Sequence, residues 1–336
     1  RHRGPDGDGF FCAPDVALGM RRLSIIDVTG SDQPLHNEDR TLALVFNGEI
    51  YNYRELREAL AARGHRFATA GDGETILHLY EEHGLDLFTH LRGMYAIALW
   101  DSGRSRLVVA VDHIGMKPLY LHERDGITYF ASEVKALTAV GAPAREINLD
   151  VLDTYLSFGY MIGAETLFAH VQRVMPGHAL VVEGGAAKMV EFSSVLSPQS
   201  SVLNDDPIMT ARSLIEESVR LHLRSDVPLG LFLSGGVDSA AVLALMTREA
   251  GGRVLTYTVG YGGDTPDNEL AQAKRTAAHF GSQHIERVIS ADDWWDALPA
   301  YVDHLDEPVA NSSAVAQMLL AEETAKHVMT TGDIST

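Results

Sequence analysis

Hydrophobic and polar positions follow two different patterns along the chain. In the first part, short apolar or alternating runs bounded by Gly and Asp predict β-strands over residues 41–46, 94–100, 107–111 and 127–131. Apolar residues at helical spacing predict helices that end at Gly64 and Gly84 and span residues 54–63 and 74–83. Residues 180–192, with Gly184-Gly185 in the middle, predict a hairpin. We therefore expect a mixed sandwich of packed sheets and helices.

Beyond residue 200 the pattern becomes an alternation of strands and helices. Strands are predicted at 229–233, 254–259 and 284–289, with a last apolar stub at 328–329. Helices are predicted at 208–223, 239–250, 269–280, 293–304 and 314–327. This alternation predicts a doubly wound parallel α/β sheet whose ligand site lies at the carboxyl ends of its strands. The Ser-rich stretch around 193–201 marks a linker, so the expected domains are 1–192 and 207–336, joined by 193–206.

The amino-acid composition excludes several classes of binding partner and of structural site. Lys and Arg total 27 against 46 Asp and Glu, so the net charge is 27 − 46 = −19. Such a surface repels phosphate backbones and anionic membranes, and we expect neither nucleic acid nor a membrane as partner. The only cysteine, Cys12, allows no intrachain disulfide and no Cys-based zinc site. No apolar run reaches the ~18–20 residues of a spanning helix, so we expect a soluble protein of the cytoplasm.

A glycine loop lies between the predicted strand 229–233 and the helix that follows it. Its sequence is Ser234-Gly235-Gly236-Val237-Asp238-Ser239. Backbone N–H groups beside adjacent glycines and at a helix N-terminus bind anions. Asp238 would repel bare phosphate, which leaves it a role on Mg²⁺ or as the helix N-cap. The plain alternative is a βα turn in which two glycines allow tight packing.

This loop resembles the pyrophosphate loop of the ATP pyrophosphatases, and its surroundings resemble the asparagine synthetase family. The flanking match includes residues 257–260, Asp306-Glu307-Pro308 and Ser312-Ser313. The resemblance implies ATP and Mg²⁺ as cofactors, with the ion on Asp238 and the phosphates held by Ser234 through Ser239. It places the adenosine beside Phe232, Leu233, Val259 and Gly260. It also puts Thr331 and Gly332 on the nucleotide and makes Asp333 the acidic residue that assists adenylation.

Four motifs before residue 75 are similar to the glutamine-hydrolysing half of the same family. They span residues 1–6, 22–27, 47–52 and 71–74. The resemblance implies a class II amidotransferase domain with an Ntn-hydrolase αββα sandwich. Its glutamine site would include Leu23, Ser24, Ile25 and Ile26 as well as the polar residues considered next.

The polar residues of these motifs suit a free amino acid. Arg22 can pair with the α-carboxylate, and Glu49 and Asp72 can accept from the α-ammonium. Asn47 and the Gly48 N–H can form an oxyanion hole. Each has a plain alternative when taken alone: a surface charge for Arg22, a hairpin turn for Asn47-Gly48, and a helix cap for Asp72.

The chain departs from the family pattern at both ends. The family's nucleophile is an N-terminal cysteine, whereas residue 1 is Arg1. Cys12 follows the first motif in an apolar stretch, and we predict a small buried strand residue that cannot replace the nucleophile. After Asp333 the family's second phosphate motif is not continued. We therefore expect a piece of a longer protein, inactive in both half reactions by itself.

The resemblance implies an ATP-dependent amidotransferase. Glutamine would supply ammonia, aspartate or a related carboxylate would be adenylated, and an amide, AMP and pyrophosphate would be released. Two alternatives stay open: a β-lactam synthetase-like ligase without glutaminase activity, and a chain that only binds ligands. The expected partners are small molecules, and a homodimer is left open.

Overall fold

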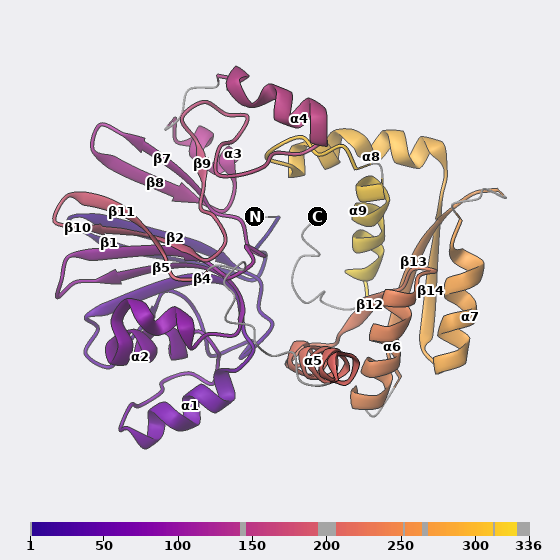
Figure 1. Cartoon of the computed structure of the whole chain (residues 1–336), viewed down its shortest axis with the longest axis horizontal. Coiled ribbons are helices and arrows are strands. Elements are labelled where there is room, and N and C mark those ends of the chain that lie inside the picture. The colour runs from indigo at the N-terminus through magenta and orange to yellow at the C-terminus, as the bar shows by residue number, and fades with distance from the viewer. Residues whose placement is uncertain are drawn as a thin grey trace. The chain divides into compact units, whose positions relative to one another are not determined.

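The structure is a computed structural model that describes residues 2–141, 146–193, 206–250, 253–263, 268–311 and 313–327. The chain divides into two compact units, Arg1–Gln199 and Ser200–Ile334 (Figure 1). Each unit has a sheet with helices of its own. The two units are therefore described separately.

The first unit is built around an antiparallel six-stranded sheet. Its longest strand pairing, between β4 (Leu42–Ile50) and β5 (Gly93–Asp101), is aligned over nine residues of each strand. The order across the sheet is β11-β10-β6-β5-β4-β3. The remaining four strands are β3 (Leu35–His36), β6 (Arg106–Val111), β10 (His178–Glu183) and β11 (Ala186–Glu191).

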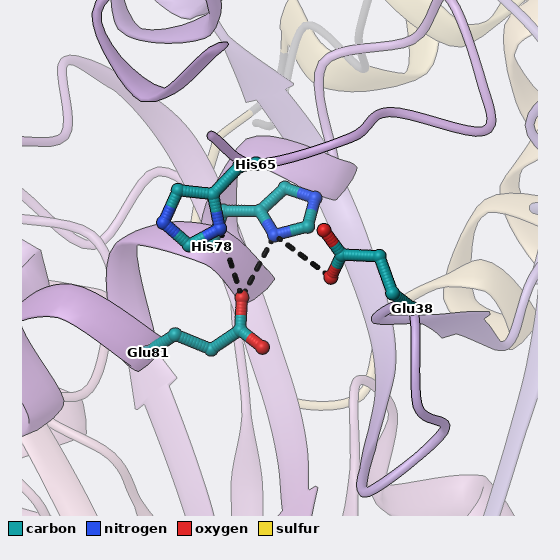
Figure 2. Close-up of side chains that lie close together, drawn as sticks. All are labelled: Glu38, His65, His78 and Glu81. Atoms are coloured by element: carbon teal, nitrogen blue, oxygen red, sulfur yellow. Dashed lines mark hydrogen bonds and ion pairs between the residues drawn. The ribbon is translucent and has the colours of Figure 1, made fainter. Parts of the chain in front are cut away.

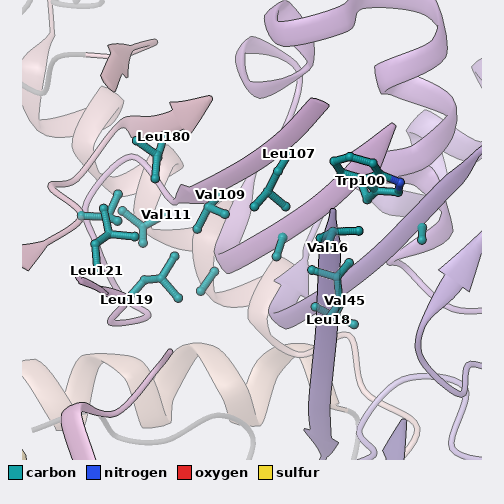
Figure 3. Close-up of a cluster of buried hydrophobic side chains, with 14 residues drawn as sticks. Val16, Leu18, Val45, Trp100, Leu107, Val109, Val111, Leu119, Leu121 and Leu180 are labelled. Carbon is teal, nitrogen blue, oxygen red and sulfur yellow. The ribbon is translucent and has the colours of Figure 1, made fainter. Parts of the chain in front are cut away.

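A second β-layer packs on one face of this sheet. It contains the hairpin β1 (Gly7–Ala13) and β2 (Val16–Arg22), and a three-stranded sheet of β7 (Tyr120–Arg124), β8 (Ile127–Ala131) and β9 (Gln172–Arg173). Figure 3 shows the core between the layers, to which Leu18, Val109 and Leu121 contribute. Burying one such side chain contributes roughly 1.5–3 kcal/mol, so this core is the main stabilising element of the unit.

Helices cover the outer faces of the two β-layers. On the six-stranded sheet lies α2 (Glu74–His83), followed by the 3₁₀ turn η1 (Gly84–Thr89), and α1 (Tyr53–Ala62) packs beside α2 (Figure 1). On the other layer, α3 (Val134–Ala139) packs Val134 and Leu137 against Tyr120 and Val171. The short elements η2 (Leu149–Val151) and α4 (Leu152–Phe158) come next along the chain. The layer order is therefore α-β-β-α, as predicted.

The second unit is a parallel sheet in the order β12-β13-β14, with helices on both faces. One face packs on α5, α6 and α7 through Leu243 and Ala277, and the other packs on α9 through Leu320. The helices are α5 (Pro207–His222), α6 (Val237–Ala250), α7 (Leu270–Phe280), α8 (Ala291–His304) and α9 (Ser313–Thr324). The strands are β12 (Gly230–Phe232), β13 (Leu255–Tyr261) and β14 (Gln283–Ile289).

Local signals explain where the helices of this unit begin. Asp206 caps α5 by accepting hydrogen bonds from the Ile208 and Met209 amides, at 3.1 and 3.0 Å. Ser290 and Asp293 form a reciprocal capping box at the start of α8. None of the helices in the described part of the chain has the length and apolar character needed to cross a membrane.

The predicted elements are confirmed with small shifts, and two expectations need correction or fall outside the structure. Cys12 lies in a strand, as predicted, but its side chain is exposed, because the alternation of β1 turns Phe11 and Ala13 toward the core. The predicted apolar stub 328–329 lies outside the described residues. The strands β2, β3, β7 and β9 and the short helices α3 and α4 were not predicted.

Candidate active site

Strand β4 carries Asn47, Gly48 and Glu49 near its C-terminal end, beyond the two residues that pair with the edge strand β3. These residues pair with Ala96, Tyr95 and Met94 of β5. Gly48 has a φ of 153°, and a Cβ added there would lie 2.0 Å from the Met94 carbonyl oxygen. Only glycine fits so close to a neighbouring strand. The Asn47-Gly48 pair is thus an interior strand segment, and the alternative of a hairpin turn is wrong.

The edge of β4 that faces away from β5 is satisfied by side chains. Gln33 bonds both the N–H and the carbonyl of Phe46, at 2.7 and 3.0 Å, and Asp72 Oδ2 accepts from the Ile50 N–H at 2.7 Å. Backbone N–H directions alternate along a strand, so the Gly48 amide is directed to this same edge, between Phe46 and Ile50. This placement suits a donor for an oxyanion.

Two buried carboxyl groups flank this edge. Glu49 and Asp72 are 4% and 6% exposed. Burial raises the pKa of Glu49 to about 7, with a further increase from the neighbouring Asp72 and an opposing effect of Lys117. Burial likewise raises the pKa of Asp72 to about 6, opposed by backbone hydrogen bonds and by Arg22. A cation placed between these groups would favour their charged forms.

Arg22 lies at the end of β2 and is buried, so the alternative of a surface charge is wrong. Its guanidinium donates to the carbonyls of Ile26, Asp27 and Val28 at 3.2, 2.7 and 3.2 Å. It therefore holds the segment that contains Ser24, Ile25 and Ile26, all buried, and Leu23, which is partly buried. One donor also meets the carboxylate of Asp32, whose side chain is 89% exposed, at 3.2 Å. A carboxylate can thus reach this guanidinium from solvent.

Asp72 precedes α2 but does not cap it. The helix begins at Glu74 after Gly73, with no side-chain cap, and the Asp72 carboxylate bonds to β4 instead. A Cβ on Gly73 would lie 2.3 Å from the Phe46 ring, so the start of α2 packs directly on β4. This packing joins Asp72 to the strand that carries Glu49.

Sequence reasoning missed three residues that complete this polar cluster. Lys117 and Asp112 are buried, and Lys117 opposes the raised pKa of Glu49. Asp112 accepts from the amides of Tyr95, Ile114 and Met116, each at 3.1 Å. Burial, with Glu49 and Asp112 nearby, raises the pKa of Tyr51. The spacing Asp112-x4-Lys117 was visible in the sequence, but nothing in it indicated burial.

The glycine loop of the second unit lies between β12 and α6. Ser234 and Ser239 bond to each other through their hydroxyl groups at 2.8 Å, and the Gly236 N–H donates to Ser234 Oγ at 3.1 Å. The Gly235 N–H donates to Glu269 Oε2 at 2.9 Å. The Glu269 carboxylate thus already accepts a hydrogen bond from one amide of this loop. Asp238 is exposed within the first turn of α6, so it is not the helix N-cap.

The residues expected beside adenosine lie at the carboxyl ends of β12 and β13. The parallel register pairs Phe232 with Tyr257, which puts Ser234 level with Val259. Phe232 and Val259 pack beside Leu320, whereas the Leu233 side chain packs on the opposite face of the sheet. A Cβ on Gly260 would lie 2.3 Å from Leu270, so the start of α7 closes on that glycine. For Leu233, therefore, the backbone but not the side chain can face a ligand at this edge.

Several predicted positions fall outside this geometry. Thr331, Gly332 and Asp333 lie outside the described residues, as does Ser312. Cys12 pairs with Ala17 in the β1–β2 hairpin. Its strand position is exposed, and none of the interactions among the described residues joins Cys12 to Glu49 or Asp72.

Comparisons with known proteins agree in both halves of the chain. Residues 1–193 match the glutamine amidotransferase domain family, and residues 210–335 match the asparagine synthase family. Asparagine synthetase [glutamine-hydrolyzing] 1 of Bacillus subtilis is 40% identical over 97% of this chain and 51% of its own length. A putative asparagine synthetase of Mycobacterium bovis is 40% identical, over 98% and 53%. The chain spans about half the length of these relatives.

Solved structures show weaker likeness. The glutamine phosphoribosylpyrophosphate amidotransferase of B. subtilis covers 80% of this chain, and 51% of its own chain is covered, at a TM-score of 0.40 and 20% identity. An NH3-dependent NAD synthetase of Campylobacter jejuni covers 34%, with 48% of its own chain covered, at a TM-score of 0.24 and 22% identity. The two matched families and the relatives at 40% identity establish that the chain belongs to the asparagine synthetase (glutamine-hydrolysing) family, with an Ntn-type glutamine amidotransferase domain followed by a synthetase domain.

Proposed function

We propose that this protein is an ATP-dependent amidotransferase. Glutamine and water give glutamate and ammonia at the first unit. ATP and a carboxylate, aspartate in the simplest case, give an acyl-adenylate and pyrophosphate at the second. Ammonia then forms the amide and releases AMP. The observation that carries the proposal is the buried Glu49–Asp72 pair beside Asn47-Gly48 on β4, in a chain of this family.

The first unit offers a group for each part of glutamine. The α-ammonium lies between Glu49 and Asp72, where its charge offsets the cost of ionising two buried carboxyl groups. The α-carboxylate pairs with Arg22 and displaces the exposed Asp32. Leu23 through Ile26 line the pocket. The Asn47 side chain and the Gly48 N–H stabilise the oxyanion that forms when the side-chain amide is attacked.

The second unit offers a phosphate loop for ATP. Ser234, Gly235, Gly236 and Ser239 present hydroxyl and amide donors at the start of α6. Asp238 fits a role on Mg²⁺ because its carboxylate is exposed at this helix start, and Mg²⁺ commonly binds one protein carboxylate together with substrate phosphates. Bound Mg²⁺ would neutralise phosphate charge. Thr331, Gly332 and Asp333 are further proposed contacts to the nucleotide.

The experiment separates the two half reactions in the full-length protein. Glutamate release from glutamine tests the first unit, and pyrophosphate release from ATP with aspartate or other carboxylates tests the second. We expect Glu49→Gln to raise KM for glutamine while pyrophosphate release with free ammonia is unchanged. Pyrophosphate release without any glutamate formation would instead support the β-lactam synthetase-like alternative. No response to aspartate would remove the asparagine assignment.

A further inference from the structure

A cluster of four side chains lies on the outer helical layer of the first unit. Glu38 follows β3, His65 follows α1, and His78 and Glu81 lie one helical turn apart on α2. One ligand atom from each residue lies within 4.8 Å of all the others. Figure 2 shows both imidazole rings directed toward the Glu81 carboxylate, with Glu38 closing the group. No role in glutamine hydrolysis or adenylation uses these residues.

The separations suit a tetrahedral metal ion. His78 Nδ1 lies 2.8 Å from Glu81 Oε2 and 3.7 Å from Glu38 Oε2, and His65 Nδ1 lies 3.3 Å from Glu81 Oε2. Bond lengths of about 2.0–2.2 Å to nitrogen and oxygen place tetrahedral ligands roughly 3.3 Å apart. These three separations lie on both sides of this value. Small side-chain movements would therefore complete the geometry.

The atoms that face away from the centre have supporting partners. Glu38 Oε1 accepts from the Arg66 N–H at 2.9 Å, and Glu81 Oε1 accepts from Asn37 Nδ2 at 2.7 Å. The outer nitrogen of His65 bonds to Glu82 Oε1 at 2.9 Å. Histidines that bind metals donate their second ring N–H to a carboxylate or carbonyl in the same way. Three of the four ligands are thus already oriented with one atom inward.

The fourth ligand, His78, differs from the other three in the surroundings of its outer ring nitrogen. Its side chain is fully buried, and its Nε2 lies 3.8 Å from Glu74 Oε1 and has no hydrogen-bond partner among the residues that the structure describes. Four carboxylates, Glu38, Glu74, Glu81 and Glu82, surround two imidazole rings, and Arg63 contacts only Glu82 among them, at 2.9 Å. An inward-bound cation would offset this surplus of negative charge.

We propose that Glu38, His65, His78 and Glu81 bind one divalent transition-metal ion, and that the ion is structural. Two imidazole and two carboxylate donors favour Zn²⁺ over Mg²⁺ or Ca²⁺, which prefer oxygen ligands alone. All four positions are filled by protein side chains, as in closed structural sites. The ion would join α2 to the segments around Glu38 and His65. This assignment does not depend on the proposed function.

Titration of the chelator-treated protein with Zn²⁺, without glutamine or ATP, tests the assignment. We expect one site with micromolar or tighter affinity, a higher Tm with Zn²⁺, and tetrahedral d–d absorption when Co²⁺ replaces Zn²⁺. Glu38→Gln and His65→Gln should each weaken Zn²⁺ binding at least 10-fold, and Glu82→Gln should weaken it about 10-fold through His65. A bound metal raises stability only in the variants that still bind it.

Matched controls separate this site from ordinary surface binding. Glu58→Gln on α1 and His279→Gln on α7 remove the same groups at exposed positions outside the cluster. Both should retain wild-type affinity. Glu38→Gln keeps an oxygen that can accept from Arg66, so it should fold normally without metal. Equal Zn²⁺ affinity in the cluster and control variants, or an octahedral Co²⁺ spectrum, would overturn the proposal.

Discussion

The two candidate sites of this chain use opposite means to bind charged groups. In the first unit, Glu49 and Asp72 are buried side chains, fixed on strand β4 and at the start of α2, which packs against that strand. In the second, Ser234 through Ser239 form a largely exposed turn and helix start whose donors are mostly backbone amides and hydroxyls. Burying ionisable side chains costs free energy, and the resulting site is sensitive to packing and pH. An exposed amide loop is tolerant of both, and its cost is competition from neighbouring acceptors such as Glu269.

The largest expected effect is the loss of stability when a tightly packed glycine of the first unit is replaced. Gly48→Ala places a Cβ against the Met94 carbonyl and should lower the free energy of unfolding by about 3 kcal/mol or more. Gly126→Ala is the matched control, because its φ is 74° but nothing lies within 4 Å of the added Cβ. It should cost only about 1 kcal/mol. Urea denaturation measures both, and equal losses would show that the close strand contact is not what requires glycine at residue 48.

A smaller effect is expected in pH dependence. The folded pKa values of Glu49 and Asp72 lie above their ordinary values, so the folded state binds more protons than the unfolded state. Their contribution to stability is therefore complete below about pH 4 and is lost as pH rises through about 6 to 7. Glu49→Gln should remove about 2 kcal/mol from the difference in unfolding free energy between pH 5 and pH 8. An equal pH difference in the wild type and in Glu49→Gln would show that Glu49 does not bind an extra proton in the folded state.

A third effect concerns the loop of the second unit. Removing Glu269 frees the Gly235 amide and removes a negative charge near bound phosphate. We expect Glu269→Ala to strengthen binding of ATP several-fold, corresponding to about 1 kcal/mol, with Glu269→Gln in between. Glu249→Gln, an exposed change near the end of α6, is the control. Weaker binding in Glu269→Ala would mean that this carboxylate supports the loop rather than competing for it.

The smallest expected effect is the number of protons released when glutamine binds. Glu49 has a pKa of about 7, so it is partly protonated at neutral pH, and a bound ammonium would favour its ionised form. Glutamine binding should then release up to about half a proton from Glu49 at pH 7. Calorimetry in two buffers with different ionisation enthalpies measures this number. Identical heats in both buffers would place the glutamine ammonium away from Glu49.

The sequence predicts the second unit better than the first. Capping residues such as Asp206 and the regular alternation of strand and helix place its elements within a few residues. In the first unit, glycines and exposed polar residues in β1 hide the alternation, and the exposure of Cys12 was mispredicted for that reason.

The candidate sites divide in the same way. The residues of the glycine loop are contiguous, so the motif contains the site. Lys117 and Asp112 could not be placed beside Glu49, because burial of charged groups depends on strands far apart in the sequence. The cluster of Glu38, His65, His78 and Glu81 is assembled from three segments, and no local spacing indicates it.

The hydrogen bond from the Ile50 amide to Asp72 has a consequence for spectroscopy. The bond joins strand β4 to the carboxylate at 2.7 Å, so the chemical shift of this one amide depends on whether Asp72 is ionised. Its proton is a built-in indicator of the charge state of the candidate glutamine site. Following that resonance during a glutamine titration would report, at a single atom, when the ligand's charge reaches the buried pair.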